Sequence, residues 1–331
     1  SKRSSRPSKL FIGTAILTLG MVGLVGCSRL TEQDPIVEAP IAPGQTSEGK
    51  SSSTSESNPD ALFEEVSSQE TGVDFTHRLD PDHPKAYLYH SGYTCGGVCV
   101  GDVNGDGLSD IFLVSGPDDN ALFINKGDFN FEKSLASYSL SGEEAWGVGA
   151  SMTDVDGDGD LDIYVCNYDA PNRLYLNEGI EQGQLRFTEC ASDAGLAYAG
   201  PSQCPYFADL DGDGKLDLFL LTNRLYAPFG RPQEIASELG PDGKVRIKEK
   251  YARYFRVVLP DVEAPSEAAQ SPPPFMLEYG HADRIYRNEG IGENGQPRFR
   301  DITEGSGIEE SIGHGLSALI WDINEDGRPD L

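Results

Sequence analysis

The sequence predicts an all-β fold, a β-propeller of which about three and a half blades lie in this chain. A nine-residue pattern, D-x-[DN]-x-D-G-x-x-D, occurs at residues 102–110, 154–162, 209–217 and 322–330. Short runs of β-branched, aromatic and other apolar residues follow the first three copies, as in Ile111–Val114, and such runs are typical of strands. The first three copies begin at intervals of 52 and 55 residues (154 − 102 and 209 − 154), which indicates a repeated unit of blade size.

Each copy of the pattern places oxygen-bearing side chains at alternate positions, which suits calcium. The ion takes about 6 to 8 oxygen ligands, and a loop meets this demand with carboxylates and a backbone carbonyl. Positions 1, 3, 5 and 9 would supply side-chain oxygens and position 7 its carbonyl, while the glycine at position 6 allows a sharp turn. The side chain at position 7 is expected to point away from the ion. The predicted ligands are Asp102, Asn104, Asp106, Leu108 and Asp110; Asp154, Asp156, Asp158, Asp160 and Asp162; Asp209, Asp211, Asp213, Lys215 and Asp217; and Asp322, Asn324, Asp326, Arg328 and Asp330.

An EF-hand and a metal-free acidic turn are the alternatives to a calcium-binding hairpin loop. An EF-hand needs flanking helices and a glutamate at position 12, but position 12 is Leu113, Val165 and Leu220 in the first three copies. Ordinary acidic turns would not require the glycine that stands at position 6 of every copy. Asn104 and Asn324 lower the charge of the first and fourth loops, so their calcium affinity should be lower. All these sites should fill only where calcium is plentiful.

A second signature follows the first three loops and predicts the outer strands of each blade. Residues 120–127, 172–179 and 283–290 share the form [ND]-x-[LI]-[FY]-x-N-x-G, which fits a third strand ended by a turn. A fourth strand is expected after each of them, which gives four antiparallel strands per blade. Residues 62–73 resemble that fourth strand but precede the first loop, so the chain is expected to enter the ring by its last strand.

An insertion is expected at residues 226–280, between the second and third strands of the third blade. It explains why the last two loops begin 113 residues apart (322 − 209). Apolar residues from Val245 to Val258 keep partly helical spacing among basic residues, so a partly helical insertion is predicted. This helix could contact a partner, or it could pack on the blades with its charges in solvent. The blades, residues 61–331, are incomplete at the C-terminus, and the remainder is expected beyond Leu331.

The first residues have the anatomy of an export signal. Residues 1–27 combine a basic start, an apolar run and a small-residue site, and Leu24–Cys27 resembles the lipobox of bacterial lipoproteins, in which Cys27 would be lipidated. An uncleaved anchor helix and a plain secreted chain are the alternatives. Residues 28–60 contain few large apolar groups and are expected to form a disordered tether. The chain is therefore expected to be lipid-anchored in the bacterial cell envelope, at the outer membrane or surface, or else secreted.

Five cysteines lie beyond the signal, which fits an oxidising compartment. Proximity in the sequence suggests Cys95 with Cys99 and Cys190 with Cys204 as disulfides, and leaves Cys166 as a buried thiol. No C-x-x-C occurs, which argues against zinc or haem.

The strong negative charge of the chain disfavours negatively charged partners. The net charge of −28 becomes −32 when the four basic residues of the signal are removed (−28 − 4). Nucleic acid and bare anionic surfaces are therefore poor partners. Contact with a membrane is expected only through the N-terminal lipid.

The loops and the blade order resemble FG-GAP or VCBS-type repeats, which also form the heads of integrin α-subunits. Gly72–His77, Gly96–Val98 and Asp283–Asn288 more closely resemble the cartilage acidic protein and ASPIC/UnbV family of bacterial exported proteins. The resemblance covers about residues 62–331. It implies an integrin-like propeller of seven blades, commonly followed by a small C-terminal domain. It implies calcium at the loop positions above and no catalytic residues.

These features favour a non-enzymatic, surface-displayed binding or adhesion module for a protein or carbohydrate, stabilised by Ca2+ at up to four sites. The alternative is an envelope enzyme on a calcium propeller, either a polysaccharide lyase or a hydrolase of lipids or phosphoesters. Such a site would need converging acid, base and cation groups. Its candidate residues show no spacing that joins them: His77, His83, Tyr89, His90, His281 and His314.

Overall fold

The computed structural model describes residues 65–93, 96–230, 232, 237–242, 244–258, 275–309 and 312–331. The predicted signal, the lipidation site Cys27, the tether and Cys95 lie outside these residues. Within the described part, strands dominate and the helical segments have three to five residues. The predicted all-β class is therefore confirmed.

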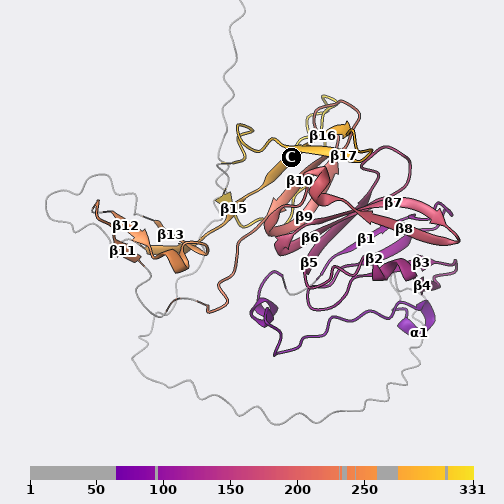
Figure 1. Ribbon diagram of the computed structural model, residues 1–331, viewed down its shortest axis with the longest axis horizontal. Helices are drawn as coiled ribbons and strands as arrows, with labels where there is room; N and C mark the ends of the chain where they lie inside the picture. Colours follow the sequence, from indigo (N-terminus) through magenta and orange to yellow (C-terminus); the bar gives the residue numbers. More distant parts are fainter. Residues whose placement is uncertain are drawn as a thin grey trace, which may run out of the picture. The chain divides into compact units, whose positions relative to one another are not determined.

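Twelve strands form three units of four antiparallel strands, each paired in sequence order (Figure 1). The first unit contains β1 (Val98–Gly101), β2 (Asp110–Leu113), β3 (Ala121–Asn125) and β4 (Phe131–Lys133). The second contains β5 (Trp146–Thr153), β6 (Asp162–Pro171), β7 (Arg173–Glu181) and β8 (Gln184–Glu189). The third contains β9 (Ala199–Ala208), β10 (Asp217–Thr222), β16 (Arg284–Ile291) and β17 (Pro297–Asp301). Four strands in this order are the prediction for a propeller blade, and they are confirmed.

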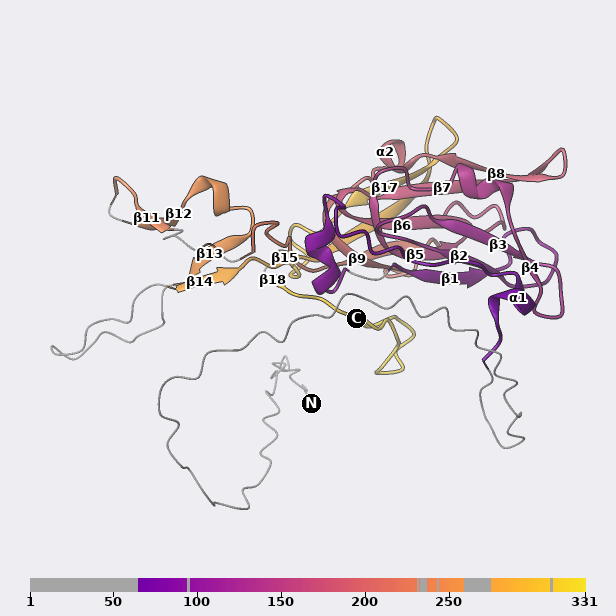
Figure 2. The same ribbon diagram turned by 90° about the horizontal axis from the view of Figure 1, so that it is seen from below.

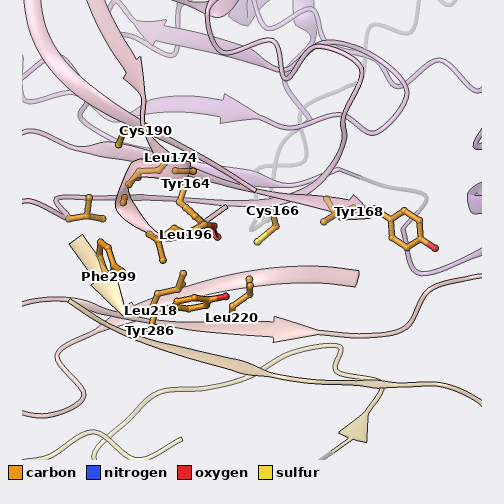
Figure 3. Packing of buried hydrophobic residues seen from close by; sticks show 14 of the residues in the cluster. Tyr164, Cys166, Tyr168, Leu174, Cys190, Leu196, Leu218, Leu220, Tyr286 and Phe299 are labelled. Carbon is orange, nitrogen blue, oxygen red and sulfur yellow. Dashed lines mark hydrogen bonds between the residues drawn. The ribbon is translucent and has the colours of Figure 1, made fainter. Parts of the chain in front are cut away.

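The second strands of the second and third units are the most buried strands of those units, because their two faces meet different neighbours. Successive side chains of a strand point to opposite faces. In β6, Tyr164 therefore belongs to the buried cluster that contains Leu218 and Tyr286 of the third unit (Figure 3). Ile163, next to it, belongs to the cluster that contains Phe112 of the first unit. The apolar core thus lies between neighbouring units.

The first strands of the units approach each other closely, and glycine makes the approach possible. A methyl group placed on Gly149 of β5 would lie 2.5 Å from the carbonyl oxygen of Gln203 in β9. One placed on Gly97, just before β1, would lie 2.8 Å from the Cα of Gly149. β1, β5 and β9 are therefore the inner strands of the three units, and Figure 2 shows them near one another.

The segment before the first unit occupies a position that is repeated later in the chain. Helix α1 (Ser68–Thr71) ends at Gly72, whose added methyl group would lie 2.2 Å from the carbonyl oxygen of Phe131 in β4. Helix α2 (Ala191–Ala194), after β8, ends at Gly195, which meets Phe299 of β17 in the same way at 2.6 Å. The chain therefore enters the first unit in the same way as it enters the third unit from the second. This arrangement is expected if the chain comes from the last strand of a preceding blade. Of the segment predicted to resemble that strand, residues 62–64 lie outside the described residues, and residues 68–71 form α1 rather than a strand.

The predicted helix in the insertion is wrong. β11 (Ser237–Leu239) pairs with β12 (Val245–Ile247), and β13 (Phe255–Val258) pairs with β14 (Phe275–Glu278). Between the two hairpins lies a short 3-10 helix, Glu249–Tyr251. Val245 and Ile247 alternate with basic residues, and this period of two suits a strand better than a helix.

The other described elements connect or extend the three units. They are the 3-10 helices η1 (Ala86–His90) and η2 (Leu135–Tyr138), and the strands β15 (His281–Ala282) and β18 (Ile312–Gly313). β15 and β18 pair with each other, so the chain after the third unit returns to the start of β16. No helix in the described residues is both long and apolar enough to cross a membrane.

Candidate metal centres

Each of the first three acidic loops joins the first strand of a unit to its second strand. The fourth loop is closed by an isolated bridge between Trp321 and Asp330. At position 6, Gly107, Gly159, Gly214 and Gly327 have φ values of 85°, 98°, 86° and 85°. Glycine adopts these values without the steric cost that other residues incur, which is why the pattern requires it.

The carboxylate at position 1 accepts hydrogen bonds from the backbone of its own loop. Asp154 accepts from the N–H groups of Gly157 and Gly159, at 2.7 and 3.1 Å. The bond from the glycine at position 6 recurs in the other loops at 2.7, 2.9 and 2.8 Å. Each loop therefore curls around its first carboxylate.

The carboxylate at position 9 ties the loop to the sheet. In the second loop, Asp162 accepts from the N–H of Val155 at 2.9 Å and from the N–H of Asn177 in β7 at 2.9 Å. The same pair of bonds holds Asp110 and Asp217 in the first and third loops. Position 9 is thus fixed by the loop on one side and by the third strand on the other.

Carboxylates converge in the second and third loops. The ligand atoms of Asp154, Asp156 and Asp162 lie within 4.8 Å of one another, and so do those of the corresponding residues of the third loop. Burial and nearby carboxylates raise the pKa of Asp162 to about 7 and also raise the pKa of Asp156. A bound cation would relieve this repulsion, because an opposite charge nearby favours the ionised carboxylate. The first and fourth loops have asparagine at position 3 and so present fewer carboxylates, as the sequence indicates.

The third loop differs from the second because two basic side chains reach it. Lys215 Nζ lies 2.5 Å from Asp213 Oδ2, and Arg287 Nε of β16 lies 2.9 Å from Asp211 Oδ2. The expectation that the side chain at position 7 points away from the site is therefore wrong for Lys215. The long, flexible side chain of lysine can fold back onto the carboxylate two residues earlier. The cations of the protein itself partly neutralise this loop.

A repeated asparagine that the sequence did not identify as part of the site connects neighbouring units. Asn177 donates through Nδ2 to the carbonyl oxygens of Leu161 in its own unit and of Val103 in the first loop, at 3.2 and 2.8 Å. Asn288 repeats both bonds one unit later, with Leu216 and Val155, at 3.2 and 2.9 Å. We call this asparagine the inter-unit latch. Its signal in the sequence is the second asparagine of the [ND]-x-[LI]-[FY]-x-N-x-G signature.

The described cysteines are free thiols, so the predicted pairing of Cys190 with Cys204 is not present. Cys190 follows the outermost strand of the second unit, whereas Cys204 lies on β9, the inner strand of the third. Their closeness in the sequence does not bring them to the same end of a sheet. Cys166 is fully buried, as expected, and Cys99, whose predicted partner lies outside the described residues, is also free.

The histidines considered for a catalytic site take separate positions. His77 Nδ1 lies 3.1 Å from Ser115 Oγ, and His83 accepts from the N–H of Lys85 and packs near Trp146. Tyr89 and His90 both lie in η1, where Tyr89 packs near the same tryptophan, and His314 follows β18. Within the described residues, the groups of three metal-ligating side chains all lie in the acidic loops rather than around these histidines.

Comparison with known proteins agrees with this geometry. The family profile of the FG-GAP-like repeat matches residues 102–165 and 154–220. Residues 102–220 therefore contain FG-GAP-like repeats. The first match runs from the first acidic loop through the second, and the second match runs from the second loop through the third. FG-GAP repeats indicate a β-propeller fold, in agreement with the three four-stranded units.

The chain is also similar to cartilage acidic protein 1 from several vertebrates. The proteins of Homo sapiens and Mus musculus are each 35% identical over 130 residues, 39% of this chain. That of Xenopus tropicalis is 33% identical over 128 residues, 38% of this chain. The matched part is 19% of the human protein and 20% of each of the other two, so it spans about a fifth of these relatives.

Proposed function

We propose that this FG-GAP repeat protein is a calcium-stabilised, extracytoplasmic β-propeller that displays a binding or adhesion surface for a protein or carbohydrate. The observation that carries the proposal is the repeated loop. The same glycine conformation and the same bond from position 6 to position 1 recur in all four copies. Because unrelated acidic turns would not share this geometry, a common ligand is the simplest cause.

Calcium fits the donor set of these loops. The donors are carboxylate, amide and carbonyl oxygens without sulfur or imidazole, and such hard ligands suit calcium rather than zinc or copper. The second loop, with five aspartates and no basic side chain in its pattern, should bind first. The first and fourth loops carry fewer carboxylates, and the third is partly neutralised by Lys215 and Arg287.

An extracytoplasmic location is consistent with weak calcium sites. Sites of this kind fill where the ion is abundant, which is outside the cell. The FG-GAP repeats and the similarity to cartilage acidic protein 1 support an extracellular domain. Lipid anchoring at Cys27 is part of the same proposal.

The non-enzymatic role is proposed because of the roles that the loop carboxylates take. The acidic groups of the loops are committed to ion binding and to the hydrogen bonds that shape the loops, so a non-enzymatic role is proposed. Ligands would meet the other faces and the long connections of the units. The net charge of −28 makes nucleic acid a poor ligand.

Calorimetric titration of calcium into the chelator-treated protein tests the proposal. The expected result is heat of binding with a stoichiometry above one ion per chain. Asp158→Ala should remove the tightest site, whereas Asp119→Ala, at an exposed aspartate in the turn between β2 and β3, should leave the titration unchanged. Absence of binding, or equal effects of the two variants, would refute the calcium assignment.

A further inference from the structure

Four separate segments bring charged and aromatic side chains together away from the acidic loops. They are the segment around η1, the end of β6, the insertion and strand β15. We call this group the Asp169 cluster, because Asp169 interacts directly or electrostatically with the other members. It consists of Lys85, Tyr87, Tyr168, Asp169, Arg253 and His281.

Direct contacts connect these segments. Asp169 forms an ion pair with Arg253 of the insertion. The ring centroid of Tyr168 lies 4.5 Å from that of Tyr93 in the first described segment, and the hydroxyl of Tyr168 accepts from the N–H of Tyr226 at 2.7 Å. The chain of contacts therefore runs from the first described segment through β6 to the insertion.

The backbone at Asp169 has an unusual conformation. Its φ is 53°, a value that non-glycine residues rarely adopt. The pairing of β6 with β9 shifts register between Tyr168 and Ala170, so Asp169 occupies a β-bulge. Bulges redirect side chains and are frequent beside functional sites. Here the bulge places a carboxylate against an arginine that is 84 residues away in the sequence.

The charge of the cluster is opposite to that of the whole protein. Two cations, Lys85 and Arg253, lie around a single carboxylate on a chain with a net charge of −28, and the imidazole of His281 lies beside them. Burial lowers the pKa of Lys85 and of His281, so both lie in partly desolvated surroundings. Among the described residues, His281 Nε2 is buried without a hydrogen-bond partner. A negatively charged ligand would offset the positive charge of Lys85 and Arg253.

Partly exposed tyrosine rings belong to the same part of the structure. Tyr87, Tyr226 and Tyr254 are each half-buried, and Tyr226 also lies under the guanidinium of Arg224 at 4.5 Å. Such rings offer flat apolar faces with hydroxyl groups at their edges, which match the faces and hydroxyl groups of a sugar ring. An acidic peptide could use the cations but has no comparable use for the rings.

We infer that the Asp169 cluster is a binding site for an anionic saccharide, with Arg253 holding its carboxylate or sulfate group and the tyrosines contacting its ring. The inference rests on the proposed binding function and assigns that function a place and a ligand class. Binding would require the acid group of the ligand to compete with Asp169 for Arg253.

The test uses the full chain in saturating calcium and a panel of acidic oligosaccharides. Oligogalacturonate, oligoalginate and a heparin-derived tetrasaccharide supply carboxylate or sulfate, and methyl-esterified oligogalacturonate supplies the same ring without charge. Two arginines make matched variants, since Arg253 and Arg246 lie in the same insertion, have 55% and 57% of their side chains exposed, and each pairs with an aspartate. Asp169→Asn adds a variant that keeps the backbone conformation, because asparagine tolerates positive φ.

The expected result is binding of at least one acidic oligosaccharide and no binding of the ester. Arg253→Gln should weaken binding at least about tenfold, the size expected for one lost charged hydrogen bond, and Arg246→Gln should not. Asp169→Asn should bind at least as tightly as the unchanged protein. Failure of every acidic oligosaccharide to bind, or an equal loss in both arginine variants, would overturn the inference.

Two further measurements separate this inference from its rivals. Binding of hexaglutamate in place of the saccharides, with the same dependence on Arg253, would overturn the carbohydrate assignment in favour of an acidic peptide. The calcium titration of each variant is recorded in parallel. If calcium binds normally and no saccharide does, the inference fails while the calcium assignment stands; if calcium does not bind, the proposed function itself fails.

Discussion

The inter-unit latch makes a sharp prediction about stability, because the same asparagine has different surroundings in different units. Asn177 is 4% exposed and its side chain makes three hydrogen bonds, two from Nδ2 to Val103 and Leu161 and one to Oδ1 from the N–H of Gly179. Asn125 occupies the matching position in the first unit. It is more exposed, and its Nδ2 donates within its own unit, to Ser109 at 3.0 Å.

Replacing Asn177 by alanine should therefore destabilise the protein more than replacing Asn125. Each lost hydrogen bond contributes about 0.5 to 1.5 kcal/mol, so these three bonds, one buried and two part-buried, amount to roughly 2 to 4 kcal/mol. Asn125→Ala removes two more exposed bonds and should cost about 1 kcal/mol. The difference arises because the carbonyl oxygen of Val103 in the neighbouring unit loses its buried donor.

Urea unfolding of both variants in saturating calcium measures this difference. The midpoint of Asn177→Ala should fall further than that of Asn125→Ala, with little change in the slope of the free energy against urea concentration. Asn288→Ala should behave like Asn177→Ala, since it repeats the same bonds one unit later. Equal midpoints for Asn125→Ala and Asn177→Ala would refute the latch between units.

Three other predictions follow from single contacts. Arg287→Gln should strengthen calcium binding at the third loop several-fold, because the guanidinium beside Asp211 competes with the ion; unchanged heats of titration would contradict this. Gly159→Ala should cost about 1 kcal/mol or more in thermal unfolding, because alanine resists a φ of 98°; an unchanged melting temperature would show that the turn is not constrained. Tyr164→Phe should cost about 1 to 3 kcal/mol in urea unfolding, because the buried carbonyl of Leu196 loses its donor at 2.9 Å; a neutral effect would indicate that water replaces the hydroxyl.

The sequence alone predicts the repeated parts of this protein well, because their causes are local. The glycine at position 6 needs positive φ whatever lies around it, and alternating apolar residues such as Ile163 and Tyr164 need two buried faces. These local demands indicate loops and strands before any tertiary contact is known. The blade order then follows from the spacing of the repeats.

Contacts between residues that are far apart in the sequence could not be predicted from it. The latch joins Asn177 to a carbonyl 74 residues earlier, and the ion pair of Asp169 with Arg253 depends on how the insertion returns to the sheet. The helical prediction for the insertion fails because Val245 and Ile247 are two residues apart, a spacing that suits a strand and not one face of a helix. The side chain of Lys215 folds back onto its own loop, which the pattern of residue types does not reveal.

Thermal unfolding of the chelator-treated protein, as calcium is returned, tests most directly whether the ion stabilises the repeated units. With free calcium at about ten times the dissociation constant, each filled loop should add about 1.4 kcal/mol to the free energy of unfolding. Three filled loops would add about 4 kcal/mol, which corresponds to a rise of roughly 10 °C in the melting temperature. A rise of this size would support the claim that calcium bound in the acidic loops stabilises the repeated units. An unchanged melting temperature at all calcium concentrations would contradict that claim.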